Sequence, residues 1–424
     1  MNNTILSIQG KHFMINGKKT YSEIPKSRPE AHGLLMNARF IQGVFDDQGD
    51  RSRYHRFGKK FDADSNTDAL ISALPQWYKY GLRAFTVGFQ GGGPCFTIAN
   101  STIDNNPFGP DGSRLDPAYA KRMDRLIRAA DELGMVVIVS YLYPGQVFRL
   151  QDTRAVLNAV RVASRFLKEG GYTNVIIEVC NEYNIAQPHP LIYTSEGMVA
   201  LMEIARNESG GLPVGCSGTG GFLDEEVCRE SDVILIHGNG LTRQGYYNAI
   251  RRVQSWAPDK PIVCNEDSQA IGNMSVAYRS GTSWGYYNNL TKQEPPCDWG
   301  ITRGEDQFFA NRMAEGIGIE VPDIPEEDRF YLQGLEPEME YEGQRWIRLA
   351  SLDPETIDYV DFYCNEEWVY TTYVEPFTVH FDTSWKQSAW KVRPDDREWK
   401  AIIYLKNGKV LERKENTYDS TIKP

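Results

Sequence analysis

Residues 135–180 read MVVIVSYLYPGQVFRLQDTRAVLNAVRVASRFLKEGGYTNVIIEVC, and their pattern sets the class of fold. The apolar runs 135–141 and 175–180 predict buried strands, and residues 152–168 between them predict a helix. Asp152 suits the N-cap of that helix, and Gly171 suits its left-handed C-cap. Two strands joined by a crossover helix are typical of a parallel sheet.

This alternation recurs along residues 29–328. Eight strands are predicted: Leu35–Val44, Leu82–Phe89, Met135–Tyr141, Val175–Cys180, Pro213–Ser217, Val233–His237, Pro261–Asn265 and Thr282–Tyr286. Helices are predicted at Asp116–Leu133, Asp152–Lys168, Ser195–Asn207 and Gly245–Trp256. Eight β/α units over about 290 residues fit an α/β fold of the (β/α)8 TIM-barrel type. An open doubly wound sheet is the competing fold, but no Gly-rich nucleotide fingerprint follows the first strand.

Two smaller parts flank this barrel. Residues 1–28 predict an N-terminal β-hairpin, because strand-like runs flank the turn dipeptide Asn16-Gly17. Residues 329–424 predict an antiparallel β-sandwich, since the helical period stops near Pro325. Its expected strands are Trp346–Leu349, Tyr359–Tyr363, Trp368–Tyr370, Phe377–Phe381 and Ala401–Leu405.

The C-terminal part resembles a known kind of module. Its segments Val360–Tyr363, Pro376–Val379 and Lys406–Lys409 are similar to the immunoglobulin-like modules appended to secreted bacterial carbohydrate-active enzymes. Such a module would either prop the barrel or bind sugar. The aromatic residues considered for sugar binding are Trp368, Trp385 and Trp390.

Composition excludes several classes of protein. The 424 residues carry a net charge of −11, which argues against nucleic acid as a partner. The longest apolar run, Met135–Tyr143, is too short for a membrane span. Seven cysteines without a C-x-x-C pair indicate neither a disulfide framework nor zinc, and we expect no metal and no cofactor. The opening Met1–Thr4 lacks a signal segment, so we expect either a cytoplasmic protein, or a secreted or periplasmic one that has lost its signal peptide.

Two predicted strands end in a carboxylate. The fourth continues as Val179-Cys180-Asn181-Glu182, and the seventh as Cys264-Asn265-Glu266-Asp267. Strand ends of this kind form the catalytic face of a barrel, and strands four and seven lie opposite each other across it. A facing acid pair is what glycosidic cleavage requires. A single strand of this type would more simply supply a helix cap, but two matching ones favour the catalytic interpretation.

The run Val175–Glu182 resembles the acid/base signature of the retaining (β/α)8 glycoside hydrolases of clan A, especially family 5, except that Tyr183 replaces the usual Pro. The resemblance covers roughly residues 30–320. It implies that Glu182 is the general acid/base, with the raised pKa, and that Glu266 is the nucleophile. It also implies that Asn181 holds the sugar 2-hydroxyl and that Trp284 stacks on a sugar.

The resemblance fails at one further position. Thr86 stands where the clan has an Arg on the second strand, the residue that steadies the nucleophile. Arg39 on the first strand is a possible substitute. The alternative for Arg39 is an ion pair with Glu178 low in the barrel, and both interpretations stay open.

Further candidates lie at other strand ends. His237 ends the sixth strand, where it can hydrogen-bond substrate or a catalytic carboxylate. Tyr141 and Tyr143 end the third, and we expect one of them, Tyr143 in particular, to line the cleft. Period-two alternation predicts that Cys180 and Cys264 point inward beneath the acids.

A cationic segment follows the first strand. If it overhangs the active face, it can recognise anionic sugars. Its members are Arg51, Arg53, His55, Arg56, Lys59 and Lys60.

The sequence therefore predicts a retaining hydrolase that cleaves O-glycosidic bonds of β-linked oligo- or polysaccharides. A catalytically silent barrel that binds polysaccharide is the alternative. A nucleotide-dependent or metal-dependent barrel enzyme is a second one, which the absence of phosphate-binding and metal-binding motifs disfavours.

Overall fold

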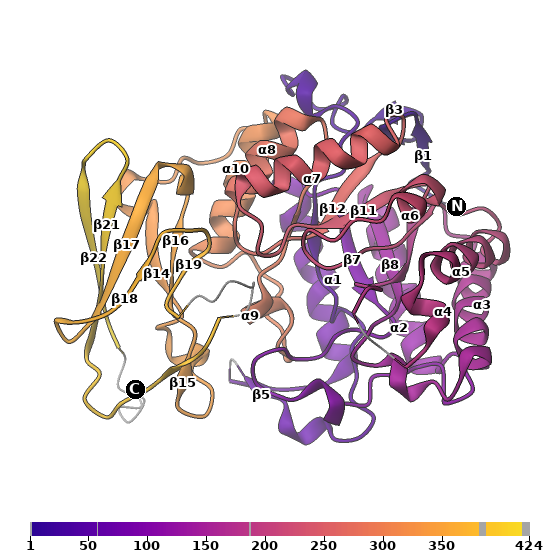
Figure 1. The fold of residues 1–424 in the computed structure, drawn as a ribbon, viewed down its shortest axis with the longest axis horizontal. Helices are drawn as coiled ribbons and strands as arrows, with labels where there is room; N and C mark the ends of the chain where they lie inside the picture. The colour runs from indigo at the N-terminus through magenta and orange to yellow at the C-terminus, as the bar shows by residue number, and fades with distance from the viewer. Residues whose placement is uncertain (1, 57, 186–187, 381–386, 418–424) are drawn as a thin grey trace.

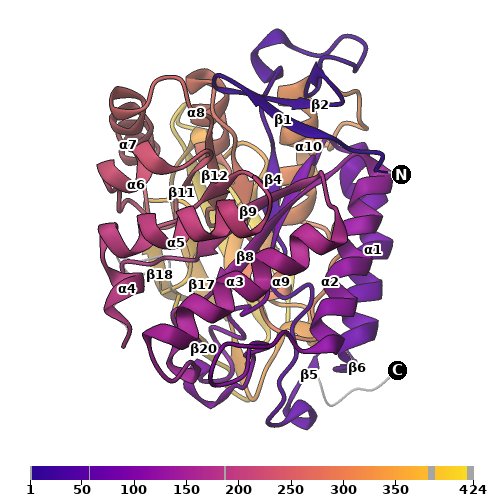
Figure 2. The ribbon, with the colours of Figure 1, turned by 90° about the vertical axis from the view of Figure 1, so that its right-hand side faces the viewer.

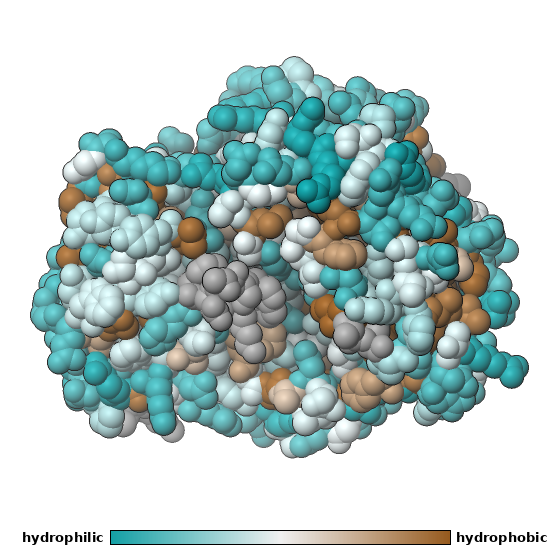
Figure 3. Space-filling view, in the orientation of Figure 1, coloured by the Kyte–Doolittle hydropathy of each residue, from teal (hydrophilic) through white to brown (hydrophobic). Residues whose placement is uncertain are grey.

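The computed structural model describes residues 2–56, 58–185, 188–380 and 387–417. Figure 1 shows a larger α/β part on the right and a smaller β part, formed by the C-terminal residues, on the left. On the face drawn in Figure 3, hydrophilic residues cover most of the surface and apolar residues form small separate groups. None of the described helices combines the length and the apolar character needed to cross a bilayer.

Parallel strands form the centre of the α/β part. Six of them make one sheet in the order β10-β9-β8-β7-β4-β13. Their bounds are β4 (Asn37–Arg39), β7 (Ala84–Gly88), β8 (Val136–Leu142), β9 (Val175–Cys180), β10 (Val214–Gly215) and β13 (Gly285–Tyr286). β11 (Ile234–His237) and β12 (Ile262–Glu266) form a separate parallel pair. Backbone hydrogen bonds connect the pair to the sheet on both sides, among them Val233 N–H to Val214 (3.2 Å) and Cys264 N–H to Ser283 (3.0 Å).

Every predicted strand of this part corresponds to an observed one, but the first is much shorter than expected. The prediction for residues 35–44 extends beyond β4, which ends at Arg39. The chain turns after it, and Gly43 N–H donates to the carbonyl of Phe40 at 2.9 Å. An apolar run therefore continues past the strand into a buried turn, a distinction that periodicity alone does not make.

Helices cover the outer face of the strands (Figures 1 and 2). The longer ones are α1 (Ala63–Lys79), α2 (Pro117–Leu133), α3 (Thr153–Gly170), α5 (Ser195–Glu208), α7 (Arg243–Trp256) and α10 (Glu305–Ile317). The shorter ones are α4 (Pro190–Tyr193), α6 (Glu225–Glu230), α8 (Gly272–Ser280) and α9 (Asn289–Lys292). As predicted, the Asp152 side chain accepts from the backbone of Ala155 at the start of α3, and Gly171 ends it with φ 66°.

A small antiparallel sheet closes one end of the strands. It consists of β1 (Leu6–Gln9), β2 (His12–Ile15) and β3 (Lys18–Lys19), and the predicted turn at Asn16-Gly17 joins β2 to β3. Phe13 is 1% exposed and belongs to the same apolar cluster as Val136, Ile176 and Val263, which begin or lie early in their strands. This small sheet thus covers the N-terminal ends of these strands. Figure 2 shows β1 and β2 at the opposite end of the molecule from β5 (His55–Arg56) and β6 (Lys59–Lys60).

The C-terminal part is built from antiparallel strands. One sheet has the order β14-β16-β19, and the other has the order β18-β17-β21-β22. The bounds are β14 (Phe330–Gln333), β16 (Arg348–Ser351), β17 (Ile357–Cys364), β18 (Glu367–Thr372), β19 (Phe377–Thr378), β21 (Glu398–Leu405) and β22 (Val410–Asn416), with a further pair β15 (Gln344–Arg345) and β20 (Trp390–Lys391). Ile347, Val360 and Trp399 belong to one buried core shared by residues of both sheets.

The aromatic residues considered for sugar binding have different surroundings. Trp368 is 60% exposed on β18. Trp390 is half-buried, and its indole N–H donates to Asp396 at 2.8 Å. Trp385, together with Phe381 at the end of a predicted strand, lies outside the described residues.

Ion pairs fix the C-terminal part to the α/β part. Arg348 on β16 pairs with Glu305 at the start of α10, and both side chains are at most 5% exposed. Arg312 on α10 pairs with Glu355. Burial by itself would raise the pKa of Glu355, but the hydrogen bonds and charge of this arginine outweigh it and lower that pKa to about 2. These ion pairs connect the C-terminal part to α10.

Candidate active site

The backbone of Glu182 has an unusual conformation just beyond β9. Its φ is +47°, in the left-handed region that a residue with a Cβ seldom adopts. The Glu182 N–H donates to the Ser217 hydroxyl at 3.2 Å, a residue that follows β10. Strained backbone of this kind persists only where its surroundings hold it, and it concentrates at functional sites.

A β-bulge aims the second carboxylate. In the β11–β12 pairing Ile236 lies opposite Cys264, but His237 lies opposite Glu266, so Asn265 is an extra residue in β12. The bulge places Glu266 beside His237 at the strand ends. It also corrects the prediction for Cys264, whose thiol faces Tyr246 of α7 in the sheet–helix core and not the space beneath the acids.

Three side chains meet where these strands end. One carboxylate oxygen each of Glu182 and Glu266 and one ring nitrogen of His237 all lie within 4.8 Å of one another. His237 Nδ1 is 3.0 Å from a Glu182 oxygen and 3.8 Å from a Glu266 oxygen. The side chains of Glu182 and Glu266 are 17% and 10% exposed, so solvent reaches both.

Arg39 on β4 binds the groups around Glu266. Its Nε lies 2.7 Å from a Glu266 oxygen, and its Nη2 donates to Asn181 Oδ1 at 2.8 Å. Its Nη1 lies 4.0 Å from Glu178. Arg39 therefore lies near both carboxylates, closer to Glu266 than to Glu178. Thr86 pairs with Arg39 in the neighbouring strand and supplies no charge, so the guanidinium comes from the first strand.

The pKa values of Glu182, His237 and Glu266 depend on their charges acting on one another and on burial. Burial alone would lower the pKa of His237, but Glu266 and Glu182 outweigh it and raise that pKa above its usual value. Burial raises the pKa of Glu182, yet the hydrogen bond from His237 outweighs it and lowers the pKa. Burial raises the pKa of Glu266, with Arg39 opposing. The direction for Glu182 is opposite to the sequence-based expectation, because the hydrogen bond from His237 favours the ionised form of this carboxyl.

The remaining candidates separate into lining and packing residues. Tyr143 is partly exposed just after β8, and burial together with the nearby Glu182 and Glu266 raises the pKa of its hydroxyl. Tyr141 is buried, with its hydroxyl 3.2 Å from Ser164 of α3. Tyr141 therefore packs inside the fold, and the lining role of Tyr143 stays a prediction. Trp284 departs from its predicted role, because it is fully buried and donates to Asp267 at 2.9 Å, leaving no ring face for a sugar.

Three site residues were missed by sequence reasoning. Asn239 donates to Glu266 at 3.0 Å, and Ser217 holds the Glu182 backbone. The Tyr287 ring lies against the Arg39 guanidinium, whose Cζ is 5.6 Å from the centroid of the ring. Each lies at or just beyond a strand end, and that position is the only signal the sequence offers.

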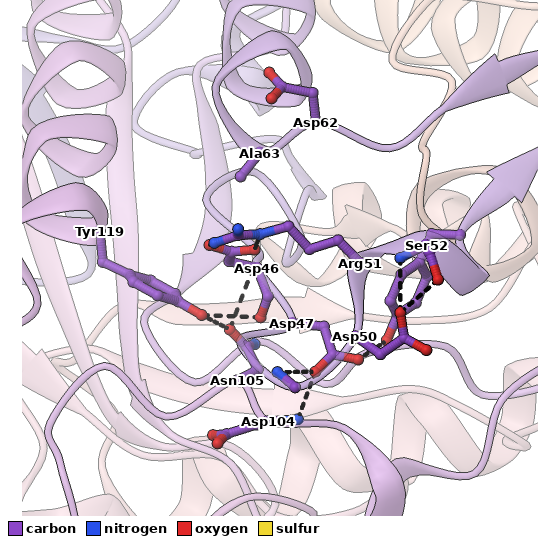
Figure 4. Close-up of polar contacts among 12 residues, drawn as sticks. Asp46, Asp47, Asp50, Arg51, Ser52, Asp62, Ala63, Asp104, Asn105 and Tyr119 are labelled. Carbon is purple, nitrogen blue, oxygen red and sulfur yellow. Dashed lines mark hydrogen bonds and ion pairs between the residues drawn. The ribbon is translucent and has the colours of Figure 1, made fainter.

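The cationic segment after β4 is largely neutralised. Arg51 Nε pairs with Asp46 at 2.6 Å, as Figure 4 shows, and Arg53 pairs with Asp47 at 2.5 Å. In the same network the Tyr119 hydroxyl donates to Asn105 at 2.7 Å. Arg51 is exposed although it is paired. His55, Lys59 and Lys60 are exposed as well, whereas Arg56 is buried. The local excess of positive charge that motivated recognition of anionic sugars is therefore smaller than the sequence indicates.

Glu182, His237 and Glu266 are also side chains of metal-ligating type at ligating distance, a proximity that their sequence spacing did not predict. Glu266 already has Arg39 at 2.7 Å, and His237 Nδ1 is engaged with Glu182. A guanidinium in this place supplies the positive charge that a cation would bring. The arrangement therefore favours an acid pair with a shared proton over a metal centre.

No family model matches this chain, and no curated protein matches it. Similar solved structures include a β-glucuronidase from Parabacteroides merdae, with 11% identity and a TM-score of 0.44, over 97% of this chain and 50% of that one. They also include an endo-β-1,4-mannanase from Thermotoga petrophila, with 12% identity and a TM-score of 0.46, over 90% of this chain and 97% of that one. A third is a putative glycoside hydrolase from Bacteroides vulgatus, with 12% identity and a TM-score of 0.48, over 90% of this chain and 81% of that one.

The chain spans about half the length of the P. merdae β-glucuronidase. All three TM-scores lie below 0.5. The activity of this chain is therefore inferred from the geometry of the site alone.

Proposed function

We propose that this protein is a retaining glycoside hydrolase that cleaves β-linked oligo- or polysaccharides. The observation that carries the proposal is the approach of Glu182 and Glu266 to within 4.8 Å at the ends of β9 and β12. Retaining enzymes hold their two carboxyl groups about 5–5.5 Å apart, whereas inverting ones leave about 6.5–9.5 Å for a water molecule. An approach of one oxygen from each acid to within 4.8 Å supports the retaining alternative.

The first step forms a covalent intermediate. A Glu266 oxygen attacks the anomeric carbon while Glu182 donates a proton to the departing glycosidic oxygen, which leaves as an alcohol. Glu182 receives that proton from His237 Nδ1 along their 3.0 Å hydrogen bond. Arg39 keeps Glu266 ionised and aimed, and Asn181, whose Oδ1 is held by Arg39, offers its amide N–H groups to the sugar 2-hydroxyl.

The second step releases the sugar. Glu266 is neutral as an ester, so Glu182 no longer faces a second negative charge and its pKa falls further. Glu182 then removes a proton from water, and the resulting hydroxide displaces Glu266 from the anomeric carbon. Two inversions give net retention, and the proton taken from water restores the Glu182–His237 pair.

The proposal extends to the architecture. We take β4, β7 to β13 and their helices as a (β/α)8 barrel with its active face at the C-terminal strand ends, the place of catalysis in that fold. Residues 329–424 form an immunoglobulin-like sandwich that props it, and residues 1–28 plug its base. The buried pair of Arg348 and Glu305 supports the role of prop.

The test is hydrolysis of a panel of aryl β-glycosides and β-linked polysaccharides, with and without a chelator. We expect turnover that chelation does not reduce and, by NMR, a first-formed product with retained anomeric configuration. Retardation in polysaccharide affinity gels without sugar release would instead favour the silent binder. Loss of turnover on chelation would favour the metal-dependent alternative, which the grouping of Glu182, His237 and Glu266 allows.

His237→Gln is expected to shift the alkaline limb of the pH–rate profile to lower pH. Turnover requires Glu266 ionised and the Glu182–His237 pair protonated, so activity falls below the pKa of Glu266 and above the pKa of the pair. The wild-type alkaline limb lies above pH 6.5, the ordinary pKa of histidine, because both glutamates raise the pKa of His237. Glutamine cannot hold the proton. An unchanged alkaline limb in the kcat/KM profile would contradict the role given to His237.

A further inference from the structure

Glu178 is a third carboxylate in the interior, and the chemistry above does not use it. It lies within β9, is 0% exposed, and points toward neighbouring strands. Its Oε1 accepts from the Ser217 hydroxyl at 2.7 Å and from the Asn265 amide at 2.9 Å. Its Oε2 lies 4.0 Å from Arg39 Nη1. A buried charge is costly unless partners of this kind surround it.

Each partner of Glu178 also contacts or adjoins a catalytic carboxylate. Ser217 accepts a hydrogen bond from the strained Glu182 backbone, so the hydroxyl bridges Glu178 and Glu182. Arg39 pairs with Glu266. Asn265 is the extra residue of the bulge that immediately precedes Glu266. One buried group is thus connected to both acids by separate routes.

We infer that Glu178 is the positioning residue that sets the two catalytic carboxylates relative to each other, through Ser217 for Glu182 and through Arg39 and Asn265 for Glu266. The inference rests on the proposed function for its kinetic consequence. Its physical content is independent of substrate: the Glu178 carboxylate faces the guanidinium at 4.0 Å, and its Oε1 accepts from a hydroxyl and from the amide of the bulge residue. Substitutions of positioning groups around a site typically cost about 10–100-fold in activity.

The two routes can be separated by substitution. Glu178→Gln keeps an Oε1 that accepts from Ser217 and Asn265 but removes the charge opposite Arg39. Ser217→Ala keeps the charge and removes the bridge to the Glu182 backbone. We expect each to lower kcat for an aryl β-glycoside by about 10–100-fold while KM changes by less than about threefold, because neither group touches substrate. Glu203→Gln, on the exposed face of α5, is the matched control with unchanged kcat.

Backbone and side-chain NMR of the substrate-free protein supplies a readout that needs no turnover. In Ser217→Ala, hydrogen exchange of the Glu182 amide is expected to accelerate at least tenfold (about 1.4 kcal/mol), with the Arg39 Nε–H signal unchanged. In Glu178→Gln the Arg39 Nε–H signal is expected to shift, with the Glu182 amide still protected. Each variant then perturbs one route only.

The outcomes distinguish the inference from the proposed function. If wild type hydrolyses no glycoside, the proposed function fails, and the NMR measurements still decide whether Glu178 sets the two acids. Wild-type kcat in Glu178→Gln together with an unmoved Arg39 signal would overturn the inference. If Glu178→Gln does not fold, Ser217→Ala decides: an unchanged Glu182 amide exchange rate would overturn it, and accelerated exchange would support it.

Discussion

Glu266→Ala is expected to reduce kcat for aryl β-glycosides by about 10⁴-fold or more, the usual cost of deleting a residue that forms a covalent intermediate. The reason is that no other described carboxylate can attack in its place: Glu182 is needed to protonate the departing oxygen, and Glu178 is fully buried. Alanine also opens space beside Arg39, whose guanidinium lies 2.7 Å from the Glu266 oxygen in the wild type.

That space makes the prediction specific. Azide can occupy it next to Arg39, attack the anomeric carbon directly and restore turnover of activated aryl glycosides. A single displacement inverts the anomeric centre, so the product is the α-glycosyl azide, identified by NMR. Glu203→Ala on α5 is the control, with wild-type kcat and no azide response. Undiminished turnover in Glu266→Ala would refute its assignment as nucleophile, and rescue with retained configuration would refute the double displacement.

Arg39→Met is expected to lower the free energy of unfolding by about 3–5 kcal/mol and to abolish turnover, because it leaves buried carboxylates without their counter-charge. The Arg39 side chain is 1% exposed, and the side chains of Glu178 and Glu266 are 0% and 10% exposed. Burial by itself would lower the pKa of the guanidinium, but Glu266 and Glu178 outweigh it and raise that pKa, so the positive charge is permanent. Urea unfolding at pH 7 measures the change.

A second substitution separates charge from packing. Adding Glu178→Leu to Arg39→Met removes one unpaired buried carboxylate, so the double variant should regain part of the lost stability while staying inactive. Arg39→Lys should unfold less readily than Arg39→Met, yet it cannot reach Glu266, Asn181 and Glu178 together. Wild-type stability of Arg39→Met would contradict the electrostatic role given to this residue.

Much of the α/β part was predictable because its strands and helix caps are marked by residues that are neighbours in the sequence. The strand Val175–Cys180 was predicted with the bounds that the structure shows, and the caps Asp152 and Gly171 act as expected. Such features depend on burial of a continuous apolar run and on the conformational preferences of single residues. The first strand was overextended because residues 40–44 are equally apolar in a buried turn.

The sequence by itself identified which residues stand at strand ends: Glu182, Glu266, His237 and Tyr143 were all placed from their neighbours in the chain. Only the tertiary structure decided how these side chains are used. The bulge at Asn265, the left-handed backbone of Glu182 and the burial of Trp284 depend on contacts between residues far apart in sequence. The pKa order of the acids was likewise invisible, since it is fixed by which charges meet in a low-dielectric interior, and Arg39 reaches Glu266 across 227 positions of chain.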